Sequence, residues 1–201
     1  MLDGWARRRI DPLVQPAAAV AVRAGISANA ITVAACIVGL AATIAIANGW
    51  FAAGLLLILA SRFGDALDGA VALLRGKTDL GGYLDIVLDF VFYGAVPMGF
   101  VLAEPAANAI PGAALILSFY VNGSSFLAYA IMAERRKLET GARGSKSLYF
   151  TTGLAEATET IAAFALSCIF PGWFPTIACV FAAMTLYTAL ARIVLAARMF
   201  R

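Results

Sequence analysis

The sequence predicts an all-α integral membrane protein, a bundle of six transmembrane helices preceded by an interfacial helix. Three observations lead to this fold class: an apolar composition, apolar stretches of membrane-spanning length, and the placement of the basic residues. Of the 201 residues, 62% are hydrophobic and 13% are charged, with a mean hydropathy of +0.88. This composition lies far outside the range of soluble globular proteins. We therefore expect a single membrane domain over residues 1–201.

The N-terminal residues 1–28 are expected to form an amphipathic helix at the membrane surface. They combine Trp5, Ile10, Leu13 and Val14 with several arginines, a pattern typical of helices that bind anionic lipid. They do not resemble a cleavable signal peptide, because the apolar run starts too late and no small-residue cleavage pattern follows.

Six later stretches are long enough to cross the hydrocarbon core, which takes about 20 helical residues. They cover residues 30–48, 51–74, 80–103, 109–133, 149–169 and 174–197. Three of the short segments that separate these stretches contain Pro or Gly, residues that break a helix and suit a tight turn. Residues 134–148 form the one long predicted loop. The sequence therefore predicts a six-helix core over residues 30–199.

Basic residues set the expected topology. The three short separators contain no Lys or Arg, whereas the other junctions and both ends contain nearly all of the basic charge. By the positive-inside rule, both termini and the link between the second and third stretches face the cytoplasm. We expect the membrane to be the inner membrane of a bacterium. The net charge of +3 thus reflects topology, and no basic face of a nucleic-acid-binding protein is visible.

Four aspartates inside the second and third stretches are the candidate functional residues: Asp65, Asp68, Asp85 and Asp89. A carboxylate in a membrane segment costs several kcal/mol unless it is paired, hydrated or bound to a cation. Asp65 and Asp68 are i,i+3, and Asp85 and Asp89 are i,i+4, so each pair projects from one helix face. The short link at 75–79 makes the two helices antiparallel neighbours. Helical rise then places the carboxylates at a common depth, about 8–14 Å from the cytoplasmic helix ends.

Four carboxylates at one level repel unless some are protonated or cations neutralise them. Oxygen ligands, and the absence of His from the sequence, favour Mg²⁺, Mn²⁺ or Ca²⁺ over zinc. Two such ions bridged by shared carboxylates can hold a phosphate for in-line displacement. Gly69, Gly81 and Gly82 would let a backbone or a headgroup approach closely. Small-residue contacts between helices would explain these glycines equally well.

These motifs resemble the signature of the CDP-alcohol phosphatidyltransferases, which is DxxDGxxAR, eight residues, then GxxxDxxxD. Here residues 65–72 read DALDGAVA and residues 82–89 read GYLDIVLD. Residues 27–32, SANAIT, are similar to the PNxIT element that opens the first transmembrane helix of the family. The resemblance implies an enzyme of phospholipid biosynthesis that moves a phosphatidyl group from CDP-diacylglycerol, or a related CDP-linked donor, to the hydroxyl of a small polar or lipid alcohol. CMP would be released, and the protein would be a homodimer surrounded by membrane lipids.

The resemblance also implies roles for the aspartates. Asp65, Asp68 and Asp85 would bind Mg²⁺ or Mn²⁺, with two ions expected, and Asp89 would be both a fourth ligand and the general base toward the acceptor hydroxyl. We expect the donor nucleotide to contact a wider set: Asn29, Thr32, Arg62, Gly69, Arg75, Lys77 and Gly82.

The sequence departs from the signature at Leu73, where the family has an arginine suited to bidentate phosphate contact. We expect Arg62, Arg75 or Lys77 to replace it, because all four acids remain. The alternatives are a catalytically altered family member and a small membrane cation transporter, which also buries carboxylates at matched depth. A transporter would not need this spacing.

The alcohol acceptor is not identified by the sequence. Lys146 and Arg192 are candidates for binding an anionic acceptor, whereas the other basic residues at 135–143 are explained by topology. Glu156 and Glu159 would instead suit an amine or a neutral polyol. A structural ion pair between Glu159 and Arg192 explains these two residues equally well.

Overall fold

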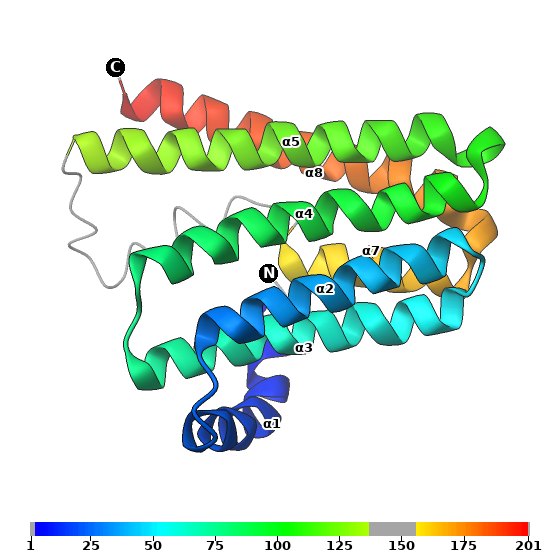
Figure 1. Cartoon of the computed structure of the whole chain (residues 1–201). Helices are drawn as coiled ribbons and strands as arrows, with labels where there is room; N and C mark the ends of the chain where they lie inside the picture. The colour runs from blue at the N-terminus through cyan, green and yellow to red at the C-terminus, as the bar shows by residue number, and fades with distance from the viewer. Residues whose placement is uncertain (1–2, 137–155, 201) are drawn as a thin grey trace.

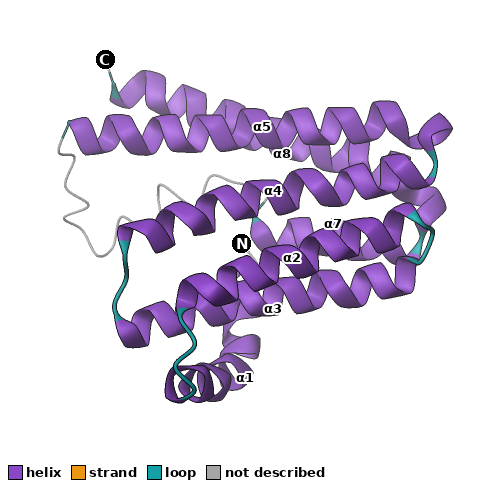
Figure 2. Cartoon of the chain, in the orientation of Figure 1, coloured by secondary structure: helices purple, strands orange, loops and turns teal. Residues whose placement is uncertain are grey.

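The computed structural model describes residues 3–136 and 156–200, and within these ranges the chain is helical with short connections and no strand (Figure 2). This confirms the all-α prediction. The helices are α1 (Asp3–Arg23), α2 (Ala28–Ala47), α3 (Phe51–Arg75), α4 (Asp79–Ala103), α5 (Pro105–Arg135), α7 (Ala157–Ile169), the short 3₁₀ helix η1 (Pro171–Trp173) and α8 (Phe174–Met199).

Within the described residues, four helical segments are long and apolar enough to cross a membrane, namely α2, α4, α5 and the stretch Pro171–Met199. Helix α3 has the same 25-residue length as α4, but Arg62, Asp65 and Asp68 interrupt its apolar character. Helix α7 has 13 residues, and the first half of the predicted stretch 149–169 lies outside the described residues. The structure thus supports an integral membrane protein, while the count of six spans stays a prediction.

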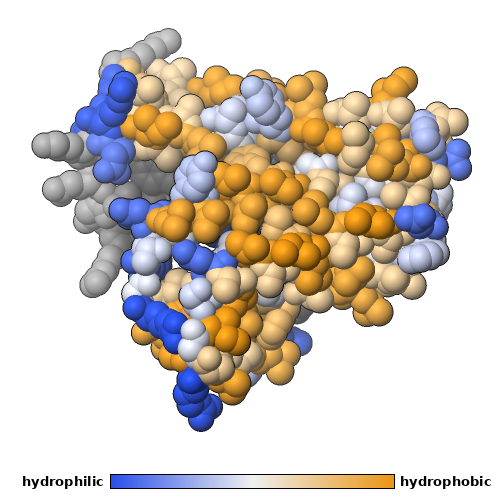
Figure 3. Space-filling model, viewed as in Figure 1, coloured by the Kyte–Doolittle hydropathy of each residue, from blue (hydrophilic) through white to orange (hydrophobic). Residues whose placement is uncertain are grey.

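Helix α2 lies between α3 and α4 and packs against both, and α5 pairs with α8 in a neighbouring layer (Figure 1). Helix α4 contacts α5 and thereby joins the two groups, and α7 packs on α3. The link between α3 and α4 is three residues long, so these helices run antiparallel with the C-terminal end of α3 joined to the start of α4. Figure 3 shows apolar side chains across the middle of the visible face, with hydrophilic ones at its two ends.

The core that fixes these helices is aromatic. Phe100 stacks on Phe174 with ring centroids 4.6 Å apart, and Phe92 meets Phe164 edge to face at 6.2 Å. Gly39 on α2 makes room for the Phe92 ring, because a Cβ at this glycine would lie 2.6 Å from Cδ2 of that ring. Close helix packing of this kind holds α4 against α2.

Helix α1 packs against α3 through its apolar side. Val14 and Ala18 are buried in a small cluster with Ala70 and Val71, whereas Leu13 is 67% exposed. Arg75 at the end of α3 also donates hydrogen bonds to carbonyls at the end of α1. The predicted N-terminal helix therefore exists and has a protein partner, and its interfacial location stays a prediction.

Candidate functional site

The aspartates of α3 and α4 come together in the structure. Asp65, Asp68 and Asp85 each offer a carboxylate oxygen, and these three oxygens lie within 4.8 Å of one another. The short link and the matched helical spacing bring them together from two antiparallel helices. Asp85 is exposed, Asp65 is half-buried and Asp68 is buried, so this triad opens to the outside at Asp85.

Asp68 is the member of the triad that most needs a cation. It is 5% exposed, and its Oδ2 atom has no hydrogen-bond partner in the part of the chain that the structure describes. A buried carboxylate oxygen without a donor is costly. A hard divalent cation held by three carboxylates would satisfy it. The residues present therefore fit a Mg²⁺ or Mn²⁺ ion.

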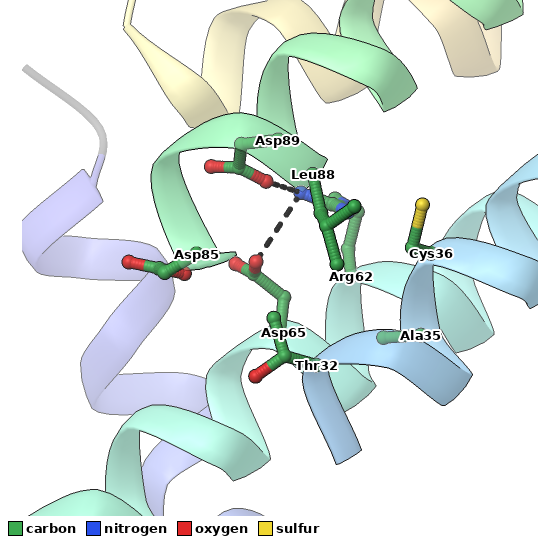
Figure 4. A pocket seen from close by; sticks show the side chains of 8 residues that line it. All are labelled: Thr32, Ala35, Cys36, Arg62, Asp65, Asp85, Leu88 and Asp89. Atoms are coloured by element: carbon green, nitrogen blue, oxygen red, sulfur yellow. Dashed lines mark hydrogen bonds and ion pairs between the residues drawn. The ribbon is translucent and has the colours of Figure 1, made fainter. Parts of the chain in front are cut away.

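Asp89 is engaged differently. Nη1 of Arg62 donates a 2.6 Å hydrogen bond to Oδ1 of Asp89 and lies 3.5 Å from Oδ1 of Asp65 (Figure 4). The arginine side chain is 9% exposed, whereas the two carboxylate side chains are about one-third exposed. Arg62 thus bridges acids from α3 and α4 at the edge of the triad.

Three elements hold Arg62 in place. Its guanidinium carbon lies 3.8 Å from the centroid of the Phe92 ring on α4, a cation–π distance. Its Nη2 atom donates to Oγ of Ser61 at 3.3 Å, and that hydroxyl donates to the carbonyl of Ala35 on α2 at 2.8 Å. The structure gives Arg62 these partners, and its predicted contact with the donor stays a prediction.

A small pocket adjoins this arrangement. Its lining includes two residues that sequence reasoning singled out from α2 and α3, Thr32 and Arg62, together with Asp65, Asp85 and Asp89. The other lining residues, Ala35, Cys36 and Leu88, are small or apolar and have no sequence signal of their own (Figure 4). Ser27 caps α2 by accepting a hydrogen bond from the amide of Ala30, which places Thr32 just after the first turn.

The glycines near the triad fall into two groups. A Cβ at Gly69 or Gly82 would meet nothing within 4 Å, so neither glycine is explained by a helix contact. A Cβ at Gly81 would lie 3.0 Å from Oδ1 of Asn29 and 3.0 Å from Oγ1 of Thr78, so Gly81 is the tightly packed one.

Gly81, rather than Gly82, stands four residues before Asp85, which is the spacing of the signature glycine. With this alignment the linker after position 73 has seven residues, one fewer than the signature. Counting back from Asp85 would have identified Gly81 from the sequence.

The two basic residues near the α3–α4 link differ in their surroundings. Arg75 donates from Nη1 to the carbonyl of Gly25 at 3.3 Å and from Nη2 to that of Val22 at 2.9 Å, so its guanidinium is committed to the end of α1. Lys77 lies in the link and is exposed.

Arg192 of α8, predicted to bind the acceptor, contacts α5. Its Nη1 atom donates to the carbonyl and Oδ1 of Asn122, at 3.0 and 2.9 Å, and to Oγ of Ser125 at 2.8 Å. The intervening Gly123 packs directly against the ring of Phe90, which follows Asp89. This contact places the Arg192 cluster beside the helix that presents Asp89.

The other predicted acceptor residues are placed less fully. Glu156 precedes α7 and Glu159 lies in its first turn, and α7 packs on α3. Lys146 lies outside the described residues.

A model of the CDP-alcohol phosphatidyltransferase family matches residues 25–200. The inner membrane protein YnjF of Escherichia coli (strain K12) is 42% identical over 193 residues, covering 96% of this chain and 94% of that protein. The archaetidylinositol phosphate synthase of Methanothermobacter thermautotrophicus is 38% identical over 94 residues, covering 46% of this chain and 45% of that protein.

Crystal structures of Mycobacterium tuberculosis phosphatidylinositol phosphate synthase (PgsA1) have the same fold. The structure with CDP-DAG bound has a TM-score of 0.65 at 21% identity and covers 91% of this chain and 92% of that one. The complex with manganese and citrate also has a TM-score of 0.65 at 21% identity, with coverages of 90% and 87%.

Proposed function

This chain belongs to the CDP-alcohol phosphatidyltransferase family, and we propose that it transfers a phosphatidyl group from CDP-diacylglycerol to the hydroxyl of an alcohol, with release of CMP, as a step of phospholipid biosynthesis. The observation that carries the proposal is the convergence of Asp65, Asp68 and Asp85, whose oxygens lie within 4.8 Å of one another, beside Asp89. The crystal structures of the M. tuberculosis synthase with CDP-DAG and with manganese support the donor class and the use of a metal.

The triad would hold Mg²⁺ or Mn²⁺. When bound, the ion supplies positive charge that offsets the charge of the donor diphosphate and of the leaving CMP. Asp68 would gain the partner that its buried Oδ2 atom needs. Asp85, the exposed member, lies where the donor would approach.

Asp89 would act as the general base. Arg62 bonds its Oδ1 atom, so the other carboxylate oxygen can take the proton of the acceptor hydroxyl. The hydroxyl oxygen then forms a bond to the phosphorus that bears diacylglycerol. The bond between this phosphorus and the oxygen bridging to the cytidylyl phosphorus breaks, and CMP leaves with that electron pair. Arg62 would orient the base throughout.

The donor would lie against Gly69 and Gly82, where a side chain is absent and the surrounding space is open. Thr32 lines the neighbouring pocket, and Asn29 packs at Gly81. Lys77 is the best replacement for the arginine missing at Leu73.

The choice of Lys77 follows from the partners of the other candidates. Arg62 is bonded to Asp89, and Arg75 is bonded to the end of α1. Lys77, exposed at the cytoplasmic end of α3, can contact a diphosphate there.

The acceptor would enter on the side of Arg192. This half-buried cation and its partners Asn122 and Ser125 favour a small polar alcohol, and a phosphorylated polyol is the first to test. Two similar proteins are named as inositol phosphate lipid synthases, which agrees with this choice. Glu156 and Glu159 would set a competing preference for an amine or a neutral polyol.

We also propose that the whole chain is one inner-membrane domain with both termini and the site at the cytoplasmic face, and that it forms homodimers. The name of the E. coli relative agrees with the membrane assignment. The basic residues at alternate junctions support the orientation.

The test is incubation of the purified protein with labelled CDP-diacylglycerol and a panel of acceptors, with products resolved by mass. The panel is serine, inositol, inositol phosphate, glycerol phosphate, choline and phosphatidylglycerol. We expect CMP release that requires Mg²⁺ or Mn²⁺ and one acceptor. Failure to release CMP from any CDP-lipid would favour a catalytically altered member. Cation flux in proteoliposomes without CMP would favour a transporter.

A further inference from the structure

We infer that the guanidinium of Arg62 takes the place of a second divalent cation, so that this chain binds one metal ion, in the triad Asp65, Asp68 and Asp85. This inference rests on the proposed metal-dependent function. It replaces the expectation of two ions, because one of the four carboxylates that would share them is already paired with a fixed cation.

The contacts of Nη1 define the position. This single atom lies 2.6 Å from Oδ1 of Asp89 and 3.5 Å from Oδ1 of Asp65. It therefore joins an acid of α3 to an acid of α4, which is the bridging role that a second ion would have. Asp65 also belongs to a second group of acids, the triad with Asp68 and Asp85, in which one oxygen of each residue lies within 4.8 Å of the others.

The arginine is built into this position. Its side chain is 9% exposed, and its guanidinium lies on the Phe92 ring, which is itself 1% exposed. Nη2 donates to Ser61, whose hydroxyl is anchored on the carbonyl of Ala35. A swing away from Asp89 would break the hydrogen bond to Ser61 and the cation–π contact with Phe92, which together favour the observed position.

The charge of Arg62 is permanent, because a guanidinium does not lose its proton in proteins. A divalent ion bound to the same Oδ1 atom of Asp89 would lie next to this charge in a poorly screened environment. Repulsion there opposes the second ion, while the triad shares only Asp65 with the contacts of the arginine and stays available for the first. Asp65 contacts Arg62 and is also a member of the triad, so it links the arginine to the proposed metal site.

The experiment counts ions rather than turnover. The full chain is purified in detergent, stripped with a chelator, equilibrated with Mn²⁺ and analysed for manganese per chain by mass spectrometry. Electron paramagnetic resonance of the same samples distinguishes an isolated ion from a spin-coupled pair. We expect one isolated Mn²⁺ per wild-type chain. In Arg62→Met, which keeps a long side chain without charge, we expect a twofold higher count and a coupled spectrum.

Matched variants sharpen the test. Arg62→Lys keeps the charge and should retain one ion, and Asp85→Asn should lose the ion of the triad. Two coupled ions per wild-type chain would overturn the inference and leave the proposed function intact. One ion in Arg62→Met would also overturn it, because the arginine would then not set the count. No bound Mn²⁺ in the wild type would overturn both the inference and the proposed metal use. If Arg62→Met does not fold, the wild-type count and spectrum decide alone.

Discussion

Arg62 on α3 and Asp89 on α4, which are 27 residues apart in the sequence, are joined by a 2.6 Å hydrogen bond. The bond joins side chains of the two helices that supply the aspartates, each of which packs against α2. It pairs the carboxylate that we assign as general base with a cation, whereas Asp65, Asp68 and Asp85 are the acids that we propose as metal ligands.

We expect Asp89→Asn to lower turnover by about 10²–10⁴-fold, the usual contribution of a general base, because an amide cannot accept the proton of the acceptor hydroxyl. Binding of Mn²⁺ and of CDP-diacylglycerol should be partly retained. CMP release and equilibrium binding of the donor measure the two effects. Asp79→Asn, an exposed acid in the first turn of the same helix, is the control and should keep its activity. Normal turnover in Asp89→Asn would refute the base assignment.

Asp68→Asn should separate stability from metal binding. The substitution removes a buried charge whose Oδ2 atom has no hydrogen-bond partner among the described residues, so in the presence of a chelator the variant should unfold at the same or a higher temperature than the wild type. Its affinity for Mn²⁺ should fall by at least about 10-fold, because an amide is a weaker ligand than a carboxylate. Thermal unfolding in detergent, with and without Mn²⁺, measures both. A stability loss in chelator would show that the Asp68 carboxylate stabilises the fold without a cation.

Gly69→Ala should weaken donor binding without affecting the fold. A Cβ at this position meets nothing within 4 Å among the described residues, and Ala favours a helix over Gly, so the protein should unfold at or slightly above the wild-type temperature, while the methyl group enters the space that we assign to the donor. The KM for CDP-diacylglycerol is the measurement, and we expect it to rise. Gly172→Ala, which also meets nothing within 4 Å but lies in η1, is the control. Equal KM values in the two variants would place the donor elsewhere.

Lys77→Ala should change donor binding, whereas Arg75→Ala should change stability. Lys77→Ala should raise the KM for the donor at unchanged stability, because the exposed lysine is our candidate for contacting the diphosphate. Arg75→Ala should lower the free energy of unfolding by about 1 kcal/mol, the usual value for a hydrogen bond, because two carbonyls at the end of α1 lose their donor. Thermal unfolding and donor KM, measured on both variants, test the assignment. The reverse pattern would make Arg75 the phosphate ligand.

Much of the fold could be predicted because the length and the ends of a membrane helix can be recognised from its apolar stretch in the sequence. Apolar stretches bounded by Pro, Gly or charge correspond to α2, α3, α4, α5 and α8. The convergence of the aspartates also followed from local rules, since i,i+3 and i,i+4 spacing on two antiparallel helices determines which faces can meet.

The partners of the arginines could not be predicted in the same way. Arg62 lies three residues before Asp65, so their common face was evident, but its contact with Asp89 depends on how α3 and α4 cross. Arg75 reaches carbonyls of α1 that are 50 and 53 residues away, and no local pattern indicates them. An amphipathic helix such as α1 shows which of its sides is apolar without showing whether lipid or protein covers it.

Gly39 touches no reacting group, yet it makes room for both residues that position Arg62. A Cβ there would lie 2.6 Å from the Phe92 ring and 3.0 Å from Oγ of Ser61. A mutational scan read by activity alone would therefore mark position 39 as catalytic, and one read by stability alone would mark it as core. Activity and stability cannot be changed independently at this glycine. Variants selected for a more tightly packed core should therefore lose activity here first. Substitutions that compensate should occur at Phe92 and Ser61.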